Sequence, residues 1–318
     1  MSHVSTALRR HPPAAPAQVA TLPAIRRRQR GPAWVGRAGW LLIPAGDLYA
    51  GFVLWPIGQT VWLSFTNWDG ITGSPTWKGL DNYRRLVGDT RFLHALENNF
   101  KWVAGSWLAQ GLGLLIAALL SAQWIRARTF FRTVMFIPAT MSLVVVGIVW
   151  DQIYDPNTGV LNTALTSVGL RQLNHGWLAD QHTAMPAVIA TANWTYYGFA
   201  MVILLGGLQA IDNSLYEAAA LDGCGALRQF RYVTLPGLSN QITLLLLVSF
   251  INTLRTFDLV YVMTSGGPGR STEVAAYYIY SLAFVTNQVG YGAAVAVALT
   301  VLVLIVTVVF LRLREKNT

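Results

Sequence analysis

The chain has 318 residues, of which 53% are hydrophobic and only 12% are charged. Soluble domains carry roughly 25% charged residues, so this composition excludes an ordinary water-soluble protein and indicates a membrane environment. The formal net charge of +9 would also fit nucleic-acid binding, and the positions of the basic residues have to decide between the two interpretations.

The N-terminal segment, residues 1–37, is rich in Pro, Ala and Arg and holds seven Arg residues. It has too little apolar surface to fold, so we predict a disordered basic tail that fixes membrane orientation, with a specific binding arm as the alternative. The apolar stretch that follows is longer than the hydrophobic core of a signal peptide. The polar segment that precedes it is also longer than the polar N-terminal region of a signal peptide. We therefore expect it to remain as the first membrane span.

Six apolar stretches are each long enough to cross a membrane, which takes about 20 residues of helix. Four contain no charged residue, whereas the first includes Asp47 and the fifth includes Arg255 and Asp258. The sequence therefore predicts an all-α, polytopic bundle of six transmembrane helices in a membrane domain of residues 38–313, followed by a C-terminal segment, residues 314–318. The predicted spans are residues 38–65, 102–122, 133–150, 184–211, 238–264 and 291–311.

The basic residues are distributed unevenly between the loops. With the N-terminus inside, fifteen of the 23 Lys and Arg residues lie in inner segments and seven in outer segments, while Arg255 lies within a span. Basic residues concentrate on the cytoplasmic side of membrane proteins, so both termini are predicted to be cytoplasmic. Topology thus explains the charge, and we predict no nucleic-acid partner.

The predicted outer loops are rich in Gly, Pro, Asn and Asp, and none is large enough for a separate domain. They comprise residues 66–101, 151–183 and 265–290. In the first of them, Asp81 can cap a short helix that lies at the membrane surface. That helix would run through Tyr83, Leu86, Phe92 and Leu93.

Two spans carry clusters of polar and aromatic residues. Consecutive residues on a helix point in different directions, so only some of each cluster can face a common cavity. For any one of them, packing or anchoring at the membrane interface is the alternative role. The fourth span supplies Asn193, Trp194, Thr195, Tyr196 and Tyr197, and the fifth supplies Ser249, Asn252 and Thr253.

The inner loop between these spans, residues 212–237, has the pattern of a folded element. Ser214 and Glu217 have the spacing of a capping box, so a helix should begin there. Gly223 stands where a left-handed residue would end that helix. A second helix, residues 226–233, should end before Pro236, because proline disfavours helix in the residue before it.

The charged and metal-binding residue types suggest no catalytic site. Arg255 and Asp258 are three residues apart, so they can neutralise each other on one helical face, while Asp47 has no partner in its own span. Cys224 is the single cysteine, and the five histidines show no metal-ligand spacing. We predict no metal site and no catalytic residue.

The sequence EAAALDGCGALRQFRYVTLP of the inner loop resembles the EAA loop of permease subunits in bacterial ABC importers. Cys224 departs from the alanine usual after the glycine, and a small thiol should pack much as alanine does. The resemblance implies that this loop is a coupling element that docks on a separate ATPase. The residues that match, and to which this role is carried over, are Glu217, Ala218, Ala219, Asp222, Gly223, Phe230, Val233 and Pro236.

The resemblance extends over most of the chain from about residue 39 onward. It includes SFTNWDG, FFRTVMFIPATMSLVVVGIVW, DPNTGVLN and FDLVYVMTSGGPGRST. These motifs are similar to those of the carbohydrate-uptake subclass, and to the larger permease subunit of maltose-type importers. The resemblance thus implies a permease of the bacterial inner membrane that forms half of a sugar path. The candidate path residues are Asn193, Trp194, Tyr196, Tyr197, Ser249 and Asn252.

The resemblance also implies the partners. They are a second homologous permease, two ATP-binding subunits and an extracytoplasmic solute-binding protein. The three lysines of this chain do not fit a phosphate-binding loop, so we expect ATP and Mg to be bound by the partner ATPase and this chain not to be an enzyme.

Three alternatives remain open from the sequence. The first is a permease of the same class for a glycerol-phosphate or polyol. The second is an ion-driven secondary transporter, which would need an acidic or histidine relay through several spans, where only Asp47 and Asp258 are available. The third is a membrane scaffold without transport activity, for which the polar residues of the fourth span would be unnecessary.

Overall fold

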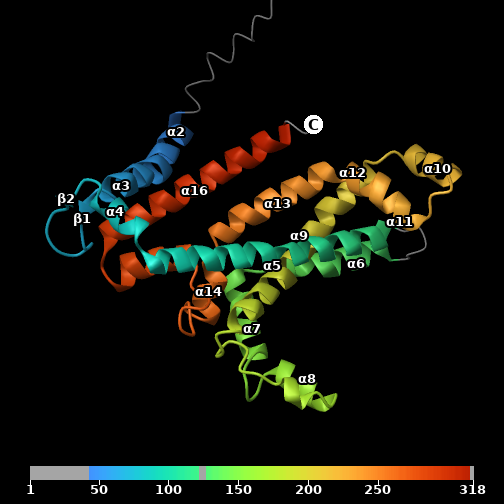
Figure 1. Ribbon diagram of the computed structural model, residues 1–318, viewed down its shortest axis with the longest axis horizontal. Helices are drawn as coiled ribbons and strands as arrows, with labels where there is room; N and C mark the ends of the chain where they lie inside the picture. The colour runs from blue at the N-terminus through green and yellow to red at the C-terminus, as the bar shows by residue number, and fades with distance from the viewer. Residues whose placement is uncertain (1–42, 122–126, 316–318) are drawn as a thin grey trace, which may run out of the picture. The chain divides into compact units, whose positions relative to one another are not determined.

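The computed structural model describes residues 43–121 and 127–315 (Figure 1). The predicted basic tail therefore lies outside the described residues, as does the end of the C-terminal segment, residues 316–318. The described residues are mostly helical. They include one short antiparallel pair of strands, β1 (Thr66–Asn67) and β2 (Thr76–Trp77), in which Thr66 pairs with Trp77.

The chain divides into two compact units, Met1–Leu54 and Trp55–Thr318. The described part of the first unit consists of α2 (Ile43–Tyr49) and the π-helical segment η2 (Ala50–Leu54). All the other elements belong to the second unit.

Three helices of the second unit are long and apolar enough to cross a membrane without a break. The first is 32 residues long, which at a rise of 1.5 Å per residue gives roughly 48 Å, so it extends beyond a hydrocarbon layer about 30 Å thick. The three are α5 (Thr90–Ser121), α9 (Ala184–Gln209) and α16 (Val289–Glu315).

Two further apolar segments are bent. The helix pair 128–140 and 143–153 meets at 96°, because Met141 and Ser142 between them are extended. The predicted third span is therefore not one straight helix. The pair 226–237 and 239–254 meets at 65°. The elements involved are α6 (Arg128–Phe136), η3 (Ile137–Thr140), α7 (Leu143–Ile153), α11 (Ala226–Gln229), η5 (Phe230–Thr234), α12 (Leu235–Gly237) and α13 (Ser239–Leu254).

The described residues thus hold three helices that are long and apolar enough to cross a membrane, or up to five if each bent pair is one span. Shorter elements connect them, and the predicted surface helix of the first outer loop is one of these. They are α3 (Trp55–Leu63), α4 (Asp81–Val87), α8 (Val160–Ser167), η4 (Arg171–Leu173), α10 (Asn213–Leu221), α14 (Asp258–Met263), α15 (Ala275–Tyr280) and η6 (Ser281–Val285).

The predicted surface helix ends earlier than expected. α4 stops at Val87, and Phe92 and Leu93 belong to α5 instead. The cause is Asp89, whose carboxylate accepts hydrogen bonds from the backbone amides of Arg91 at 2.9 Å and Phe92 at 3.1 Å. These are amides that a helix start leaves free, so Asp89 begins a new helix there.

Glycines allow α5, α9 and α6 to pack closely. A side-chain carbon added at Gly113 of α5 would lie 2.8 Å from the backbone nitrogen of Met201 in α9, and one added at Gly198 of α9 would collide with the backbone oxygen of Met135 in α6. Small residues at such contacts let helix backbones approach in a membrane, where packing drives association. This packing fixes the helices that carry the site described below.

A polar network fastens the start of α5 to the segment before α15. The Arg91 guanidinium donates to both carboxylate oxygens of the buried Glu273, at 2.6 Å and 2.9 Å. Asn99 donates to the backbone oxygen of Thr253 at 2.8 Å and accepts from the backbone amide of Ala275 at 2.9 Å. The end of α13 and the start of α15 are therefore held against the same turn of α5.

Candidate functional site

The helices of the second unit enclose a cavity of about 240 Å³. Its walls come from α5, η3 and α7, α9, α13 and α14, so it lies inside the bundle rather than in a loop. Eight polar side chains line it, and none of its 18 lining residues is charged. The polar ones are Ser106, Gln110, Asn193, Tyr196, Ser249, Asn252, Thr253 and Thr256.

Two hydroxyls of the cavity are committed to each other. Ser106 donates to the backbone oxygen of Val103 at 2.7 Å. A hydroxyl has a single proton, so in the 2.9 Å contact between Ser106 and Ser249 the donor is Ser249. Both oxygens keep lone pairs, so this wall of the cavity can accept hydrogen bonds from a ligand.

Two amide side chains of the cavity wall differ from each other in their hydrogen bonding. Asn193 is buried, and its Nδ2 donates to the backbone oxygen of Gly105 at 3.0 Å, which ties α9 to α5. The Oε1 atom of Gln110 is buried and has no hydrogen-bond partner among the described residues. A buried carbonyl without a partner costs about 1–3 kcal/mol, so Gln110 is an acceptor that a ligand in this cavity would satisfy.

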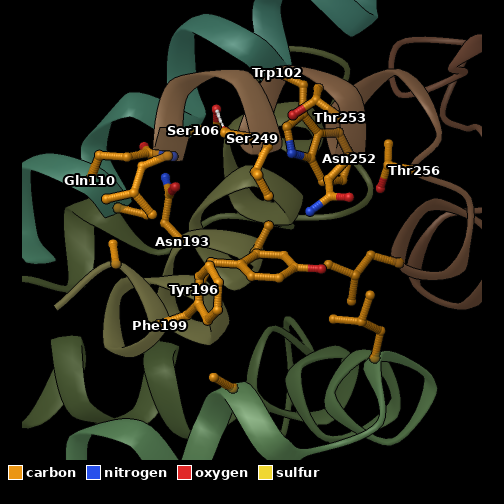
Figure 2. A pocket seen from close by; sticks show the side chains of 18 residues that line it. Trp102, Ser106, Gln110, Asn193, Tyr196, Phe199, Ser249, Asn252, Thr253 and Thr256 are labelled. Carbon is orange, nitrogen blue, oxygen red and sulfur yellow. Dashed lines mark hydrogen bonds between the residues drawn. The ribbon is translucent and has the colours of Figure 1, made fainter. Parts of the chain in front are cut away.

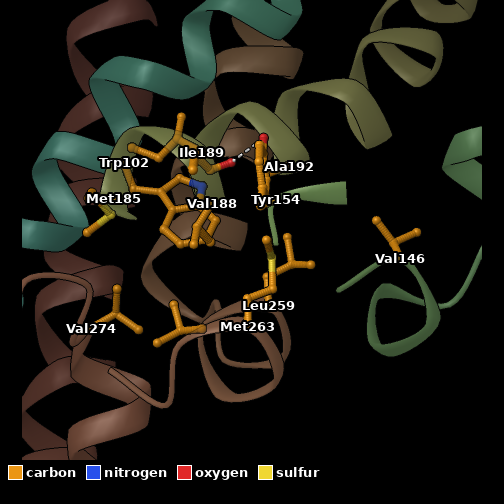
Figure 3. Close-up of a cluster of buried hydrophobic side chains, with 12 residues drawn as sticks. Trp102, Val146, Tyr154, Met185, Val188, Ile189, Ala192, Leu259, Met263 and Val274 are labelled. Carbon is orange, nitrogen blue, oxygen red and sulfur yellow. Dashed lines mark hydrogen bonds between the residues drawn. The ribbon is translucent and has the colours of Figure 1, made fainter. Parts of the chain in front are cut away.

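Aromatic rings supply the apolar part of the wall. In Figure 2 the ring of Tyr196 lies across the cavity, and Trp102 and Phe199 also line it. The wall at Trp102, Ala192 and Leu259 belongs to a cluster of buried side chains that joins α5, α9 and α14 (Figure 3). The site therefore combines hydrogen-bonding groups with aromatic faces on a tightly packed support.

The structure brings four of the six predicted path residues to the cavity: Asn193, Tyr196, Ser249 and Asn252. Trp194 and Tyr197 do not line it. The Trp194 ring packs edge-on against Trp150 with the ring centres 5.5 Å apart. The hydroxyl of Thr195 donates to the backbone oxygen of Thr191, one turn earlier.

Sequence reasoning did not identify the contribution of α5. Trp102, Ser106 and Gln110 line the cavity from three successive turns of that helix. Their spacing of four residues places them on one helical face, and this pattern was available in the sequence. Phe199 and Thr256 were also missed, because nothing in their immediate sequence separates them from packing residues.

The predicted charge pair within the membrane is not formed. α13 ends at Leu254 and α14 begins at Asp258, so Arg255 and Asp258 are not on one continuous helix. Among the described residues, no ion pair within 4.0 Å joins them, and both are exposed. Asp47 is exposed on α2 in the first unit. None of the three lines the cavity.

The inner loop forms two short helices, α10 and α11, joined by a glycine turn. Gly223 has φ of +74°, the left-handed conformation that was predicted for it. The helix cap differs from the prediction: the Asp212 carboxylate, not the Ser214 hydroxyl, accepts from a backbone amide at 2.9 Å. Asp212 stands two positions earlier and, as an anion, is at least as good a cap.

The end of the second helix also differs from the prediction. The chain stays helical through η5 and α12 to Gly237, with Pro236 in the first turn of α12, where its missing amide proton costs little. A hydrogen bond of 3.0 Å between the hydroxyls of Tyr216 and Thr234 ties α10 back to η5. The loop is therefore a compact folded element.

The residues predicted for coupling are distributed over this element. Glu217 and Ala218 are exposed on α10, where Ala219 is half-buried. Asp222 and Gly223 form the exposed turn, Phe230 and Val233 are half-buried on η5, and Pro236 is exposed on α12. α10 has no buried residue, and Leu215, Leu221 and Leu227 are all more than half exposed. Exposed apolar side chains of this kind are found on surfaces that contact a partner and on helices that lie at a membrane surface.

Residues 103–316 match the family described as binding-protein-dependent transport system inner membrane component. The chain belongs to this family. It is thus a transport permease component of the inner membrane that works with a binding protein. The inner loop and every residue that lines the cavity except Trp102 lie within the matched residues.

Individual members of the family are similar over most of their length. The probable ABC transporter permease protein YurN of Bacillus subtilis is 36% identical over 256 residues, 80% of this chain and 87% of that protein. The diacetylchitobiose uptake system permease protein NgcF of Streptomyces coelicolor is 33% identical over 77% of this chain and 72% of its own length.

A solved structure shares the fold. The bacterial alginate ABC transporter, in complex with an alginate pentasaccharide-bound periplasmic protein, has a chain with a TM-score of 0.75 and 21% identity. The match covers 90% of this chain and 95% of that chain. The likeness shows that the two chains share a fold.

Proposed function

We propose that this chain forms half of the translocation path of an ATP-driven importer for neutral carbohydrates. The observation that carries the proposal is the uncharged cavity inside the bundle, where hydroxyl and amide groups alternate with aromatic rings. Sugars present hydroxyl groups at their edges and C–H groups on their faces, and such a lining complements both. The relative NgcF, named for diacetylchitobiose uptake, supports the carbohydrate class.

A glycerol-phosphate substrate is less well supported. Phosphate groups are bound by arginine or lysine through charge-assisted hydrogen bonds. No residue that lines the cavity is charged, and Arg255, which precedes the lining residue Thr256, is not part of the wall. A neutral sugar or polyol needs no such cation.

The membrane topology in this proposal has six spans and two cytoplasmic termini. The apolar stretch that contains Asp47 supplies the first span, each bent pair supplies one, and the three unbroken helices supply the others. This arrangement would place α10 and α11 at the cytoplasmic surface and α8 outside. The excess of Lys and Arg in the inner segments supports it.

Transport would be driven by partners. The exposed helices α10 and α11 would dock on one of two ATPase subunits, which would bind the ATP and Mg, and a second homologous permease would complete the path. A solute-binding protein would deliver the sugar from outside. The exposed leucines of α10 and α11 support the docking role, since an apolar helix surface of this kind is costly in water.

A pair of adjacent tyrosines tests the cavity. Tyr196→Leu removes the ring that lies across the cavity, whereas Tyr197→Leu changes a neighbour that does not line it. With all partners present, we expect Tyr196→Leu to lower the uptake of neutral sugars at least ten-fold and Tyr197→Leu to lower it less than two-fold. Both variants should still co-purify with an ATPase that the sugar-loaded binding protein stimulates.

Three results would contradict the proposal. The first is equal loss of uptake in both variants, which would assign Tyr196 to packing. The second is uptake of sn-glycerol 3-phosphate in place of any neutral sugar. The third is uptake that continues after ATP depletion and stops when the ion gradient is dissipated, as for a secondary transporter.

A further inference from the structure

Two polar hollows adjoin at one end of the second unit and are here together called the outer groove. Their volumes are about 370 Å³ and about 330 Å³, and Arg85 and Gln288 line both of them. The walls come from β1, β2, α4, α15, η6 and the starts of α5 and α16. Figure 1 shows β1, β2 and α4 at the end of this unit opposite to α10 and α11. In the proposed topology the outer groove therefore faces the outside.

Arg85 supplies the outer groove with a cation that has no ion-pair partner among the described residues. No carboxylate of this part of the chain lies within 4.0 Å of its guanidinium, and no hydrogen bond engages it. Its central carbon lies 3.8 Å from the centre of the Tyr291 ring. The Tyr291 hydroxyl donates in turn to the Asp89 carboxylate, which holds the ring. The contact with the ring face fixes the cation, and the N–H groups of Arg85 stay available to a ligand.

The carboxylates in the groove wall are already engaged. Asp89 accepts hydrogen bonds from two backbone amides and two tyrosine hydroxyls, which fills the capacity of about four that a carboxylate has. Asp69 accepts from two backbone amides and from the Thr72 hydroxyl. Arg91, the other cation of the wall, is bonded to the buried Glu273. Within the described groove wall, Arg85 is thus the cation that still needs an anionic acceptor.

A second donor in the outer groove also lacks a partner. The Nε1 atom of Trp68 is buried without a hydrogen-bond partner among the described residues, and Trp68 lines the same hollow as Arg85. An indole N–H and a guanidinium can only donate, so a ligand that satisfies both must present acceptors. A carboxylate has two acceptor oxygens and a charge opposite to that of the guanidinium, and its geometry matches the paired N–H groups of arginine.

We infer that the outer groove is a docking site for the extracytoplasmic solute-binding protein, which inserts an Asp or Glu side chain whose carboxylate accepts hydrogen bonds from Arg85 and Trp68. The inference rests on the proposed function and adds to it the surface that receives the binding protein. The family is described by its dependence on such a protein. The groove lies at the end of the unit opposite to the loop proposed to dock on the ATPase (Figure 1). A pair of opposite charges at this site speeds association and weakens as salt screens it.

Two adjacent arginines test the site. Arg85→Gln removes the cation of the groove, whereas Arg84→Gln removes a neighbour that pairs with Asp81 at 3.2 Å and lines neither hollow. The complete transporter is placed in nanodiscs of phosphatidylcholine, and its ATPase activity is measured as the sugar-loaded binding protein is added. We expect Arg85→Gln to raise the half-maximal concentration of binding protein at least ten-fold and Arg84→Gln less than two-fold. The maximal rate should be unchanged in both variants.

Charge reversal supplies a second readout, which misfolding cannot mimic. Arg85→Glu should abolish stimulation by the wild-type binding protein. Each surface Asp and Glu of the binding protein is then replaced by Arg in turn, and one of these variants should restore stimulation of Arg85→Glu. Raising NaCl from about 50 mM to about 500 mM should raise the half-maximal concentration more for the wild type than for Arg85→Gln, because screening acts on the charge pair.

The outcomes separate this docking site from the proposed function. An equal shift in the two Gln variants, no shift in either, or no reversed binding protein that restores Arg85→Glu would overturn the docking site. A shift that appears only when the nanodiscs contain phosphatidylglycerol would assign Arg85 to a lipid phosphate, and loss of co-purification with the second permease would assign it to assembly. Both results also overturn the docking site, and in all these cases carbohydrate import stands. If the loaded binding protein does not stimulate the wild-type ATPase at all, the proposed function fails together with the inference.

Discussion

Gln110 is a polar residue of the cavity wall whose unpaired carbonyl costs stability. Its Oε1 atom is buried and unpaired among the described residues, within the wall of the cavity. Gln241 on α13 has a buried Oε1 atom of the same kind, but it does not line the cavity. The two residues therefore separate the effect of an unpaired carbonyl from the effect of its position.

We predict that Gln110→Leu and Gln241→Leu each stabilise the protein, by about 1 kcal/mol, because each removes an unpaired buried polar group. Only Gln110→Leu should reduce sugar uptake, because only Gln110 can bond to a ligand in the cavity. The expected reduction is about ten-fold, which corresponds to the loss of about 1.4 kcal/mol of binding free energy. Thermal unfolding of the purified complex and uptake assays measure the two effects. A loss of stability in Gln110→Leu would show that the carbonyl has a partner in the empty transporter.

Asp89, which precedes α5, gives the stability of the protein a dependence on pH. Burial raises the pKa of its carboxyl. Hydrogen bonds from the Tyr278 hydroxyl, the Tyr291 hydroxyl and two backbone amides lower the pKa, and their combined effect is larger than that of burial. The pKa therefore lies below its ordinary value of 3.8. A carboxyl with a lowered pKa in the folded state stabilises the protein above its ordinary pKa. That contribution is lost as the pH falls through the folded-state value.

Asp89→Asn should therefore destabilise the protein at pH 7, by about 1–2 kcal/mol for a partly exposed group that accepts several hydrogen bonds. The difference from the wild type should be constant between pH 5 and 7 and shrink below about pH 4, where the Asp89 carboxyl of the unfolded chain becomes protonated first, and it should vanish once the pH falls through the lower folded-state pKa. Unfolding temperatures measured from pH 3 to pH 7 test this. A difference in unfolding temperature between the variant and the wild type that stays constant down to pH 3 would mean that the carboxylate charge contributes nothing to stability.

The turn between α10 and α11 depends on two glycines with different roles. Gly223 has φ of +74°, whereas Gly225 has φ of −69°, and a side-chain carbon at either position would meet nothing within 4 Å. Steric clash therefore cannot distinguish them. Only Gly223 requires a conformation that costs other residues about 1–2 kcal/mol.

We predict that Gly223→Val disrupts the turn and uncouples ATP hydrolysis from uptake, while membrane insertion stays normal. Gly225→Ala should leave both activities within two-fold of the wild type, because alanine adopts that backbone conformation easily. ATPase activity and uptake, measured together on the reconstituted complex, check this. Normal uptake by Gly223→Val would contradict the docking role of the loop.

At the scale of elements, periodicity and turn chemistry predicted most of the second unit. The fourth span and the glycine turn follow directly from an unbroken apolar run and from Gly223. The break at Met141 and Ser142 was not predicted, although Pro138, Thr140 and Ser142 interrupt the apolar stretch at that point. The stop of α13 at Leu254 depends on a contact distant in the sequence, since Asn99 of α5 bonds to the backbone oxygen of Thr253.

The residues that line the cavity could also be predicted only in part from the sequence. Polar residues inside a span can be read from the sequence, and four of the six proposed for the path do line the cavity. Which face of each helix points inward depends on the neighbouring helix, so Trp194 and Tyr197 could not be separated from Tyr196 in advance. The polar face of α5 was visible as a four-residue repeat, but only the contact of α5 with α9 gives that repeat its meaning.

At the scale of the whole molecule, the proposed topology and the proposed docking surface can be tested at one residue. Cys224 is the single cysteine of the chain, and it lies half-buried in the turn between α10 and α11, next to Gly223. The wild-type protein therefore needs no cysteine-free background. A thiol reagent that cannot cross membranes reports on the side to which this turn is exposed.

We predict that a maleimide that cannot cross membranes labels Cys224 in inside-out vesicles but not in intact cells. Bound ATPase subunits should protect Cys224 from this reagent, since they would cover the turn. The control combines Cys224→Ala with Asn157→Cys, at an exposed position in the predicted outer loop before α8; this variant should be labelled in intact cells only. Labelling of the wild type from outside would invert the topology and remove α10 and α11 from any cytoplasmic ATPase. Labelling from inside that is unchanged by the ATPase would keep the topology and place the docking contact elsewhere on the loop.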